Sequence, residues 1–276
     1  MIYHNGALLN FVFPYEFLKE TNVHGTVETL RLACAGQPKY YHYVSSYSVY
    51  DTPNNKGKRV YENDPLNTAH GFSLAYSETK WVSEKLVGIA QKRGLHTVIY
   101  RPGDITGAAN GIWEMDDMVS RMIVGTIQMQ AIPRTSYCMH MTPVDFVADA
   151  ICCISRKPEA MDQAFNLVNP EPVPVKKAVS YIRACDYPVR YISFPAWKSK
   201  LKQADASENA LTLLACLFES GTDANPGVLR HFIGKDTVYD CTKANLLLNQ
   251  SGISCPPVDE KLFAAYLNYF KKNGCI

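Results

Sequence analysis

Three side chains in the first third of the sequence could act together on a carbonyl group. Tyr76 and Lys80 are separated by four positions, so on a helix they would lie on one face, one turn apart. An ammonium close to a phenol favours the ionised form, which would make Tyr76 a better proton donor near neutral pH. The hydroxyl of Ser46 could hold a substrate oxygen. Together these groups could protonate a carbonyl oxygen while hydride reaches its carbon.

The Tyr-x-x-x-Lys pattern alone is weak evidence, because it occurs three times, as Tyr15/Lys19, Tyr76/Lys80 and Tyr239/Lys243. The middle pair differs from the others in its surroundings. A strand-like run that ends in Ser45-Ser46 precedes it, and a second run that ends in Pro102-Gly103 follows it. The alternative is an exposed pair on an ordinary helix. The two flanking runs favour the functional interpretation.

Alternating strands and helices must position these groups. The apolar pattern predicts strands at 2–4, 40–44 and 96–101, and helices at 22–35, 72–93, 115–129 and 143–154. This alternation predicts an α/β fold with a parallel, helix-covered sheet. Open sheets of this kind place their chemistry at the carboxyl ends of the strands. Ser46 and Pro102-Gly103 follow two such ends.

The pattern changes after about residue 170, where helices dominate and short strands are expected at 190–194 and 237–239. We expect residues 1–170 to form the sheet-containing part that carries the catalytic groups. Residues 171–276 would form a smaller, mostly helical substrate lobe, to which residues 112–141 also contribute.

Composition excludes several classes of protein. The chain has 276 residues, 47% hydrophobic and 20% charged, with a net charge of +2, so nothing favours nucleic acid or a membrane surface. No apolar run approaches the roughly 18 residues of a membrane helix. Nine cysteines occur without a C-x-x-C pair. A cytoplasmic protein without disulfides or a metal site is therefore expected.

Five segments in a fixed order resemble the extended short-chain dehydrogenase/reductase family. Within that family the chain is most similar to the thioester reductase domains of nonribosomal peptide and polyketide synthases and of carboxylic acid reductases. The resemblance covers about the first 110 residues. Weaker similarity continues through 142–148 and 165–170. The matching segments are 4–7, 22–26, 44–46, 76–80 and 101–107.

The resemblance implies a Rossmann-like, doubly wound parallel sheet and a role for individual residues. The implied catalytic residues are Ser46, Tyr76, Lys80 and Asn22. Ser45 competes with Ser46 for the hydroxyl role. The helix of Asn22 would help to organise a water that links Lys80 to solvent, with a simple N-cap as the alternative. The implied cofactor-binding residues, besides Tyr76 and Lys80, are Asn5, Gly6, Ala7, Ser45, Pro102, Gly103 and Ile105.

The implied reaction is the NADPH-dependent reduction of an acyl or peptidyl thioester, held by a carrier domain on a phosphopantetheine arm, to an aldehyde. NADH is the alternative cofactor, and a second hydride would give an alcohol. The acyl chain stays open. Two other functions stay open as well. One is an extended short-chain reductase that acts on a free carbonyl or a nucleotide-sugar, and the other is an inactive fragment or scaffold piece.

The sequence contains no Gly-rich phosphate-binding turn of the G-x-G-x-x-G type. The nearest run, Gly103, Gly107 and Gly111, follows the Tyr76/Lys80 helix. We therefore expect a chain that is truncated before its fourth family strand, as a fragment, a decayed copy or one piece of a split enzyme. We also expect weak dinucleotide binding by the chain alone. The sheet edge left open would allow self-association.

Overall fold

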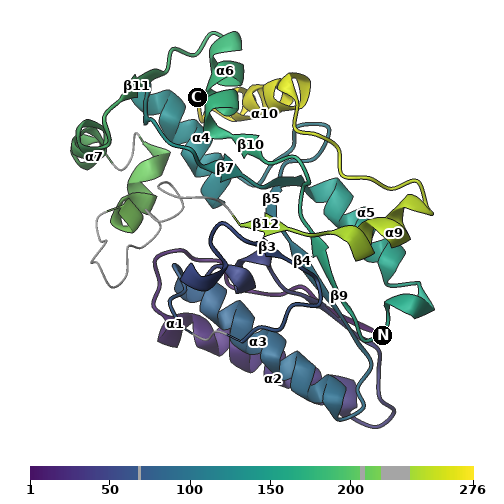
Figure 1. Cartoon of the computed structure of the whole chain (residues 1–276). Coiled ribbons are helices and arrows are strands. Elements are labelled where there is room, and N and C mark those ends of the chain that lie inside the picture. Colours follow the sequence, from purple (N-terminus) through teal and green to yellow (C-terminus); the bar gives the residue numbers. More distant parts are fainter. Residues whose placement is uncertain (68–69, 206–208, 219–236) are drawn as a thin grey trace. The chain divides into compact units, whose positions relative to one another are not determined.

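The computed structural model describes residues 1–67, 70–205, 209–218 and 237–276 (Figure 1). The chain divides into two compact units, which are described separately. The first unit comprises residues 1–103, 146–170 and 237–255. The second unit comprises the described residues within 104–145, 171–236 and 256–276.

A four-stranded parallel sheet forms the centre of the first unit. Its order is β1 (Ile2–His4), β2 (Tyr41–Val44), β4 (Thr97–Pro102) and β9 (Ala164–Leu167). Every residue of β2 and β4 is buried, as expected for inner strands that are covered on both faces. The prediction of a parallel, helix-covered sheet is confirmed.

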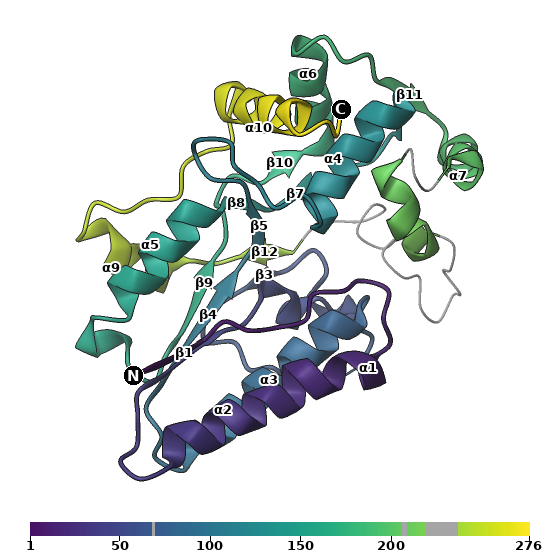
Figure 2. The ribbon, with the colours of Figure 1, turned by 180° about the vertical axis from the view of Figure 1, so that it is seen from behind.

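Helices cover both faces of this sheet (Figures 1 and 2). On one face, α2 (Gly25–Cys34) and α3 (Ala75–Lys92) pack against β2 and β4 through Ala33, Tyr41, Tyr43, Val87 and Ile99. On the other face lie α9 (Thr242–Asn249) and α5 (Val144–Ile154), the latter belonging to the first unit from Phe146 onward. The contacts on that second face come from Val44, Val98, Tyr100, Phe146, Phe165 and Leu248. Alternate residues of each strand thus serve opposite helical layers.

The helix expected at 22–35 starts earlier than predicted. It begins as α1 (Tyr15–Lys19), continues as the π-helical turn η1 (Glu20–His24) and becomes α2 without a break. The helical pattern of apolar residues is weak in this segment, because α1 buries a single side chain, Leu18. The expected start at Asn22 is therefore wrong. Asn22 lies inside the π-helical turn, a distortion that often occurs at functional sites.

Short elements complete the first unit at its polar loops. The 3₁₀ turns η2 (Tyr47–Tyr50) and η3 (Pro53–Asn55) follow β2, and η4 (Pro158–Ala160) precedes β9. The polar segment 51–71 also contains a regular element, β3 (Arg59–Val60), which pairs in parallel with β12 (Val238–Tyr239).

The second unit combines helices with three short strand pairs. Its helices are α4 (Met118–Met129), α6 (Val175–Ala184), α7 (Phe194–Gln203), η5 (Ala210–Phe218) and α10 (Glu260–Lys272). The pairs are β5 (Asp104–Thr106) with β8 (Met141–Pro143), β6 (Ala131–Pro133) with β11 (Arg190–Ile192), and β7 (Cys138–Met139) with β10 (Val173–Pro174). Within the described ranges, no helix combines the length and the apolar character needed to cross a membrane.

Candidate active site

The candidate site lies at the carboxyl edge of the sheet in the first unit. Because β1, β2 and β4 run parallel, residues 5–7, Ser45-Ser46 and Gly103 all follow the same edge. Backbone bonds extend the ladder to this edge. Ser45 N donates to Tyr100 O at 2.7 Å, and Gly103 N donates to Leu167 O at 3.0 Å. The sheet thus brings three predicted segments to one side of the unit.

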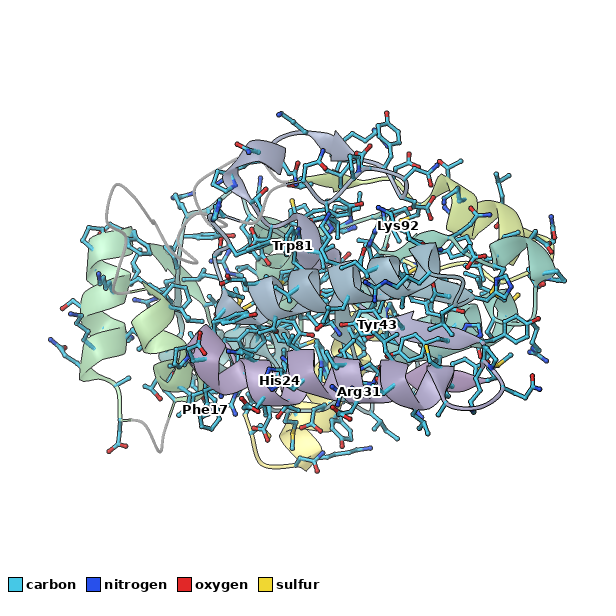
Figure 3. All side chains as sticks on the ribbon, turned by 90° about the horizontal axis from the view of Figure 1, so that it is seen from below. Phe17, His24, Arg31, Tyr43, Trp81 and Lys92 are labelled. Atoms are coloured by element: carbon cyan, nitrogen blue, oxygen red, sulfur yellow. The ribbon has the colours of Figure 1, made fainter. Side chains whose placement is uncertain are left out.

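Lys80 is almost fully buried, with 3% of its surface exposed. Its Nζ donates to Val44 O at 2.6 Å, at the end of β2, and lies 4.5 Å from the centroid of the Tyr43 ring. Figure 3 shows Tyr43 between α2 and α3. Burial lowers the pKa of Lys80 to about 7, although the negative charge of Glu84 opposes this shift. The amine therefore titrates close to neutral pH.

Tyr76 differs from its expected electrostatic state. It lies in the first turn of α3, and burial raises the pKa of its phenol to about 12. The predicted lowering by Lys80 is therefore wrong for this arrangement, in which the amine is held by Val44 O. A phenol with a pKa near 12 is protonated at neutral pH, which is the form that can donate a proton to a substrate oxygen.

The two candidate serines have different partners. Ser46 Oγ caps η2 by accepting from Ser48 N at 3.2 Å, and it shares a hydrogen bond of 2.8 Å with Ser48 Oγ. Ser45 Oγ donates to Glu84 Oε2 at 2.6 Å. The Ser45 hydroxyl is thus held by a buried carboxylate, whereas the Ser46 hydroxyl lies at the start of a 3₁₀ turn. Their roles toward substrate and cofactor stay predictions.

Asn22 joins the turn after β1 to the helix that carries Tyr76 and Lys80. Its Nδ2 donates to Leu8 O at 3.1 Å and to Thr79 Oγ1 at 3.0 Å, and its Oδ1 accepts from Leu8 N at 2.7 Å. Its own carbonyl accepts from Thr26 Oγ1 and Ser83 Oγ. The alternative of an N-cap is therefore wrong, because Asn22 is internal to the helical segment. The water-organising role stays a prediction.

Glu84 and Arg101 are the parts of this site that the sequence interpretation did not assign. Arg101 Nε donates to both oxygens of Glu84, at 3.1 and 3.2 Å, and Arg101 Nη2 donates to Oε1 at 2.5 Å. Its Nη1 donates to Tyr50 Oη and to Glu62 O. One signal could have identified Glu84. It follows Lys80 by four residues, so a carboxylate shares the buried face of the helix.

The turn after β1 is open to solvent at the carboxyl edge of the sheet. Asn5, Gly6 and Ala7 are exposed, and a Cβ built on Gly6 would meet only His4 Cε1, at 4.0 Å. The chain itself therefore leaves the space beside this glycine open. At the same edge the amine of Lys80 bonds the carbonyl at the end of β2, and Pro102 ends β4, directly before Gly103. The donor set at this edge fits the nicotinamide-ribose end of a dinucleotide.

Ile105 lies outside the first unit. It is the middle residue of β5 in the second unit, where it pairs with Thr142, and 40% of its surface is exposed. Its predicted contact with the nicotinamide ring stays a prediction. Among the described residues, no cluster of His, Cys, Asp and Glu side chains is suited to a metal ion.

Comparison with known proteins identifies relatives along the whole chain. Residues 1–151 match the NAD-binding family described as male sterility protein. A linear gramicidin synthase of Brevibacillus parabrevis is 33% identical over 99% of this chain, which spans 5% of that protein. L-2-aminoadipate reductase of Saccharomyces cerevisiae is 31% identical over 97% of this chain, which spans 21% of that protein. The chain is thus similar to a small part of each.

Solved structures agree with this relationship. The terminal R domain from the myxalamid PKS-NRPS biosynthetic pathway is 37% identical and has a TM-score of 0.87, over 99% of this chain and 68% of that domain. A thiolation-reductase di-domain from an archaeal non-ribosomal peptide synthetase has a TM-score of 0.74 over 99% of this chain and 57% of that one. At 18% identity, the second comparison supports the fold alone.

Proposed function

The chain belongs to the NAD-binding family described as male sterility protein, and we propose that it reduces a carrier-bound acyl or peptidyl thioester to an aldehyde with NADPH. The sequence resemblance to thioester reductase domains implies this reaction. The partner would be a carrier domain that presents the thioester on a phosphopantetheine arm. NADH is the alternative reductant, and an alcohol is the alternative product.

One observation carries the proposal. The 37% identity to a terminal R domain extends over 99% of the chain, and the chain keeps Tyr76 and Lys80 on one helix beside the carboxyl edge of the sheet. Relatives named as a gramicidin synthase and an aminoadipate reductase support the same class of reaction. The carrier partner belongs to the same proposal, which the 37% identity to a terminal R domain from a PKS-NRPS pathway supports.

The residues of the site have distinct roles in this reaction. When bound, the nicotinamide cofactor supplies hydride to the carbonyl carbon. Tyr76 keeps its proton at neutral pH, so it can donate to the oxygen as negative charge develops there, together with a hydrogen bond from Ser46. Lys80 would hold the nicotinamide ribose, and the turn of Asn5, Gly6 and Ala7 would lie against the cofactor. The C–S bond of the resulting hemithioacetal then breaks, the hydroxyl oxygen loses its proton as the carbonyl re-forms, and the sulfur takes up a proton, which gives an aldehyde and the free thiol of the arm.

An assay of the full-length protein tests the proposal. The protein is mixed with NADPH and an acyl thioester on its carrier domain, and aldehyde is detected by mass spectrometry. We expect an aldehyde and one oxidised NADPH for each thiol released. Turnover of free aldehydes or ketones, with no turnover of any carrier thioester, would contradict the substrate class. An unreactive protein that still binds its carrier domain would favour the scaffold alternative.

A further inference from the structure

A buried ion pair lies one helical turn beyond Lys80. The side chains of Glu84 and Arg101 are 3% and 5% exposed, and three hydrogen bonds join them. Glu84 also accepts the hydroxyl of Ser45. One carboxylate therefore contacts the ends of two neighbouring strands, at Ser45 after β2 and at Arg101 in β4. Both ends belong to the edge that carries the candidate site.

Such a pair is a poor way to stabilise a fold. Removing two charges from water costs several kcal/mol for each ion, and apolar residues of similar volume often stabilise a protein equally well. Arg101 adds bonds to Tyr50 Oη at 2.7 Å and Glu62 O at 3.1 Å, so its remaining donors are used in the loop after β2. The geometry holds loop, helix and strand ends in one arrangement, which favours a positioning role over a purely stabilising one.

The charges around Lys80 give Glu84 a second role. The groups that interact with Lys80 are the Tyr43 ring on β2, His4 on β1 and Glu84 on its own helix, and Tyr76 lies four positions earlier on that helix. The pKa of His4 is lowered to about 4, first by burial and then by the charge of Lys80, so this histidine is neutral at pH 7. Both phenols keep their protons, because burial raises the pKa of each. Glu84 is the carboxylate of this group, and its charge favours the ammonium form of Lys80.

We propose that Glu84 is a positioning residue of the active site. Its carboxylate fixes Ser45 and Arg101 at the ends of β2 and β4, and it places a negative charge one helical turn from Lys80, where it favours the ammonium over the neutral amine. The ammonium is the form that can donate to a cofactor ribose, so this role rests on the proposed function. The positioning itself is a property of the unliganded chain and can be measured without turnover.

The test measures the titration of Lys80 directly. The 276-residue chain is labelled with ¹³C at the lysine Cε, and the Lys80 signal is assigned by its loss in Lys80→Arg. The titration midpoint is then compared between the wild type and Glu84→Gln. Gln keeps the shape of the side chain and can still bond Ser45, but it removes the charge. We expect the midpoint to fall by about one pH unit, the size expected for losing a nearby opposite charge.

Two further variants make the test specific. Glu84→Asp keeps the charge, so its Lys80 midpoint should lie close to the wild-type value. Glu78→Gln removes a different carboxylate from the same helix and should leave the Lys80 midpoint unchanged. If Glu84→Gln does not fold, the double variant Glu84→Gln, Arg101→Gln removes the unpaired guanidinium and should still show the lower midpoint. A folded Glu84→Gln variant, single or double, whose Lys80 midpoint equals the wild-type value would overturn the proposal. A failed thioester assay would leave this result unaffected.

Discussion

Lys80 and Tyr76 are affected in opposite ways by the same burial. Burial lowers the pKa of the amine to about 7 and raises the pKa of the phenol to about 12, because it disfavours the charged form of each group. The spacing of the two residues predicted their shared helix correctly. It did not predict that the amine would bond Val44 O, because that contact depends on how closely α3 packs onto the end of β2.

Replacing Tyr76 by Phe should remove the proton donor without disturbing the fold. We expect turnover of the full-length protein to fall by roughly 10²–10⁴-fold, the usual contribution of general acid catalysis, while the affinity for NADPH stays near the wild-type value. Steady-state kinetics and a fluorescence titration measure the two effects. Tyr15→Phe, which alters another Tyr-x-x-x-Lys pair, is the matched control. Equal turnover in the two variants would exclude Tyr76 as the acid.

Replacing Lys80 by Met should stabilise the protein and abolish reduction. Between the folded pKa of about 7 and the ordinary lysine pKa of 10.5, the unfolded chain binds a proton at Lys80 that the folded chain does not. The folded wild type therefore gains stability as the pH rises through this window. At pH 7 burying the amine of Lys80 still costs free energy, because it disfavours the charged form. Met has no charge to bury, so we expect it to raise the free energy of unfolding by about 1–2 kcal/mol.

Urea denaturation of the wild type and Lys80→Met at pH 7, 8 and 9 measures this effect. The stability difference between the two proteins should shrink at each step. A difference that stays constant with pH would show that the folded pKa of Lys80 is not lowered.

The regular elements of the first unit could be predicted because their apolar pattern is strong. Strands β2 and β4 and helix α3 lie within three residues of the predicted bounds. The π-helical turn at Asn22 could not be predicted, because residues 20–24 contain no residue type that distinguishes a π-helical turn from an α-helical one. The Glu84–Arg101 pair was missed for a different reason. A charged residue is expected at the surface unless an oppositely charged partner is known. Glu84 and Arg101 lie on different elements, so the sequence alone does not show that they meet.

Asn22→Ala should loosen the connection between the turn after β1 and α3. The change removes an amide that is 2% exposed and makes three hydrogen bonds to Leu8 and Thr79. We expect a loss of about 1–3 kcal/mol in the free energy of unfolding, the cost of leaving buried polar groups unpaired. Asn10→Ala, whose amide oxygen accepts from the exposed Val12 N and Phe13 N, is the control and should cost less. Equal losses in chemical denaturation would contradict this role for Asn22.

Gly107→Ala should destabilise the second unit. Tyr266 Oη donates to Gly107 O at 2.6 Å, and a Cβ on Gly107 would lie 2.7 Å from Tyr266 Cε1. We expect a cost of about 1–3 kcal/mol from this overpacking, measured as a lower Tm. Gly88→Ala is the matched control, because a Cβ there meets nothing within 4 Å and alanine favours a helix. A Tm for Gly107→Ala at or above that of the control would be inconsistent with this close contact.

At the scale of the whole molecule, the candidate residues are distributed unevenly between the two units. The first unit carries the proposed acid, lysine and serine and the turn after β1, whereas Ile105 belongs to the second. The expected division into residues 1–170 and 171–276 stays a prediction. The sequence could identify the family because the site motifs lie in one continuous third of the chain, but residues that select the acyl group have no comparable motif.

The outer edge of β1 should allow the isolated chain to self-associate. Strand β1 is at the end of the sheet, and among the described strands β2 is its one partner; Tyr3 is 48% exposed. Unpaired backbone groups along such an edge can pair with a second chain. Sedimentation velocity of the 276-residue chain at increasing concentration should therefore show a shift from monomer to dimer. A single monomer peak at every concentration would contradict this expectation.

The central claim is that a phenol, an amine and a serine hydroxyl act on one carbonyl carbon. The most direct test is a crystal structure of the full-length protein with NADPH and an amide analogue of the carrier-bound thioester. We predict that Tyr76 Oη and Ser46 Oγ both lie within about 2.6–3.2 Å of the same carbonyl oxygen, and that Lys80 Nζ has moved from Val44 O to the nicotinamide ribose. A complex in which the analogue's carbonyl binds far from Tyr76, with Lys80 still bonded to Val44, would contradict the account.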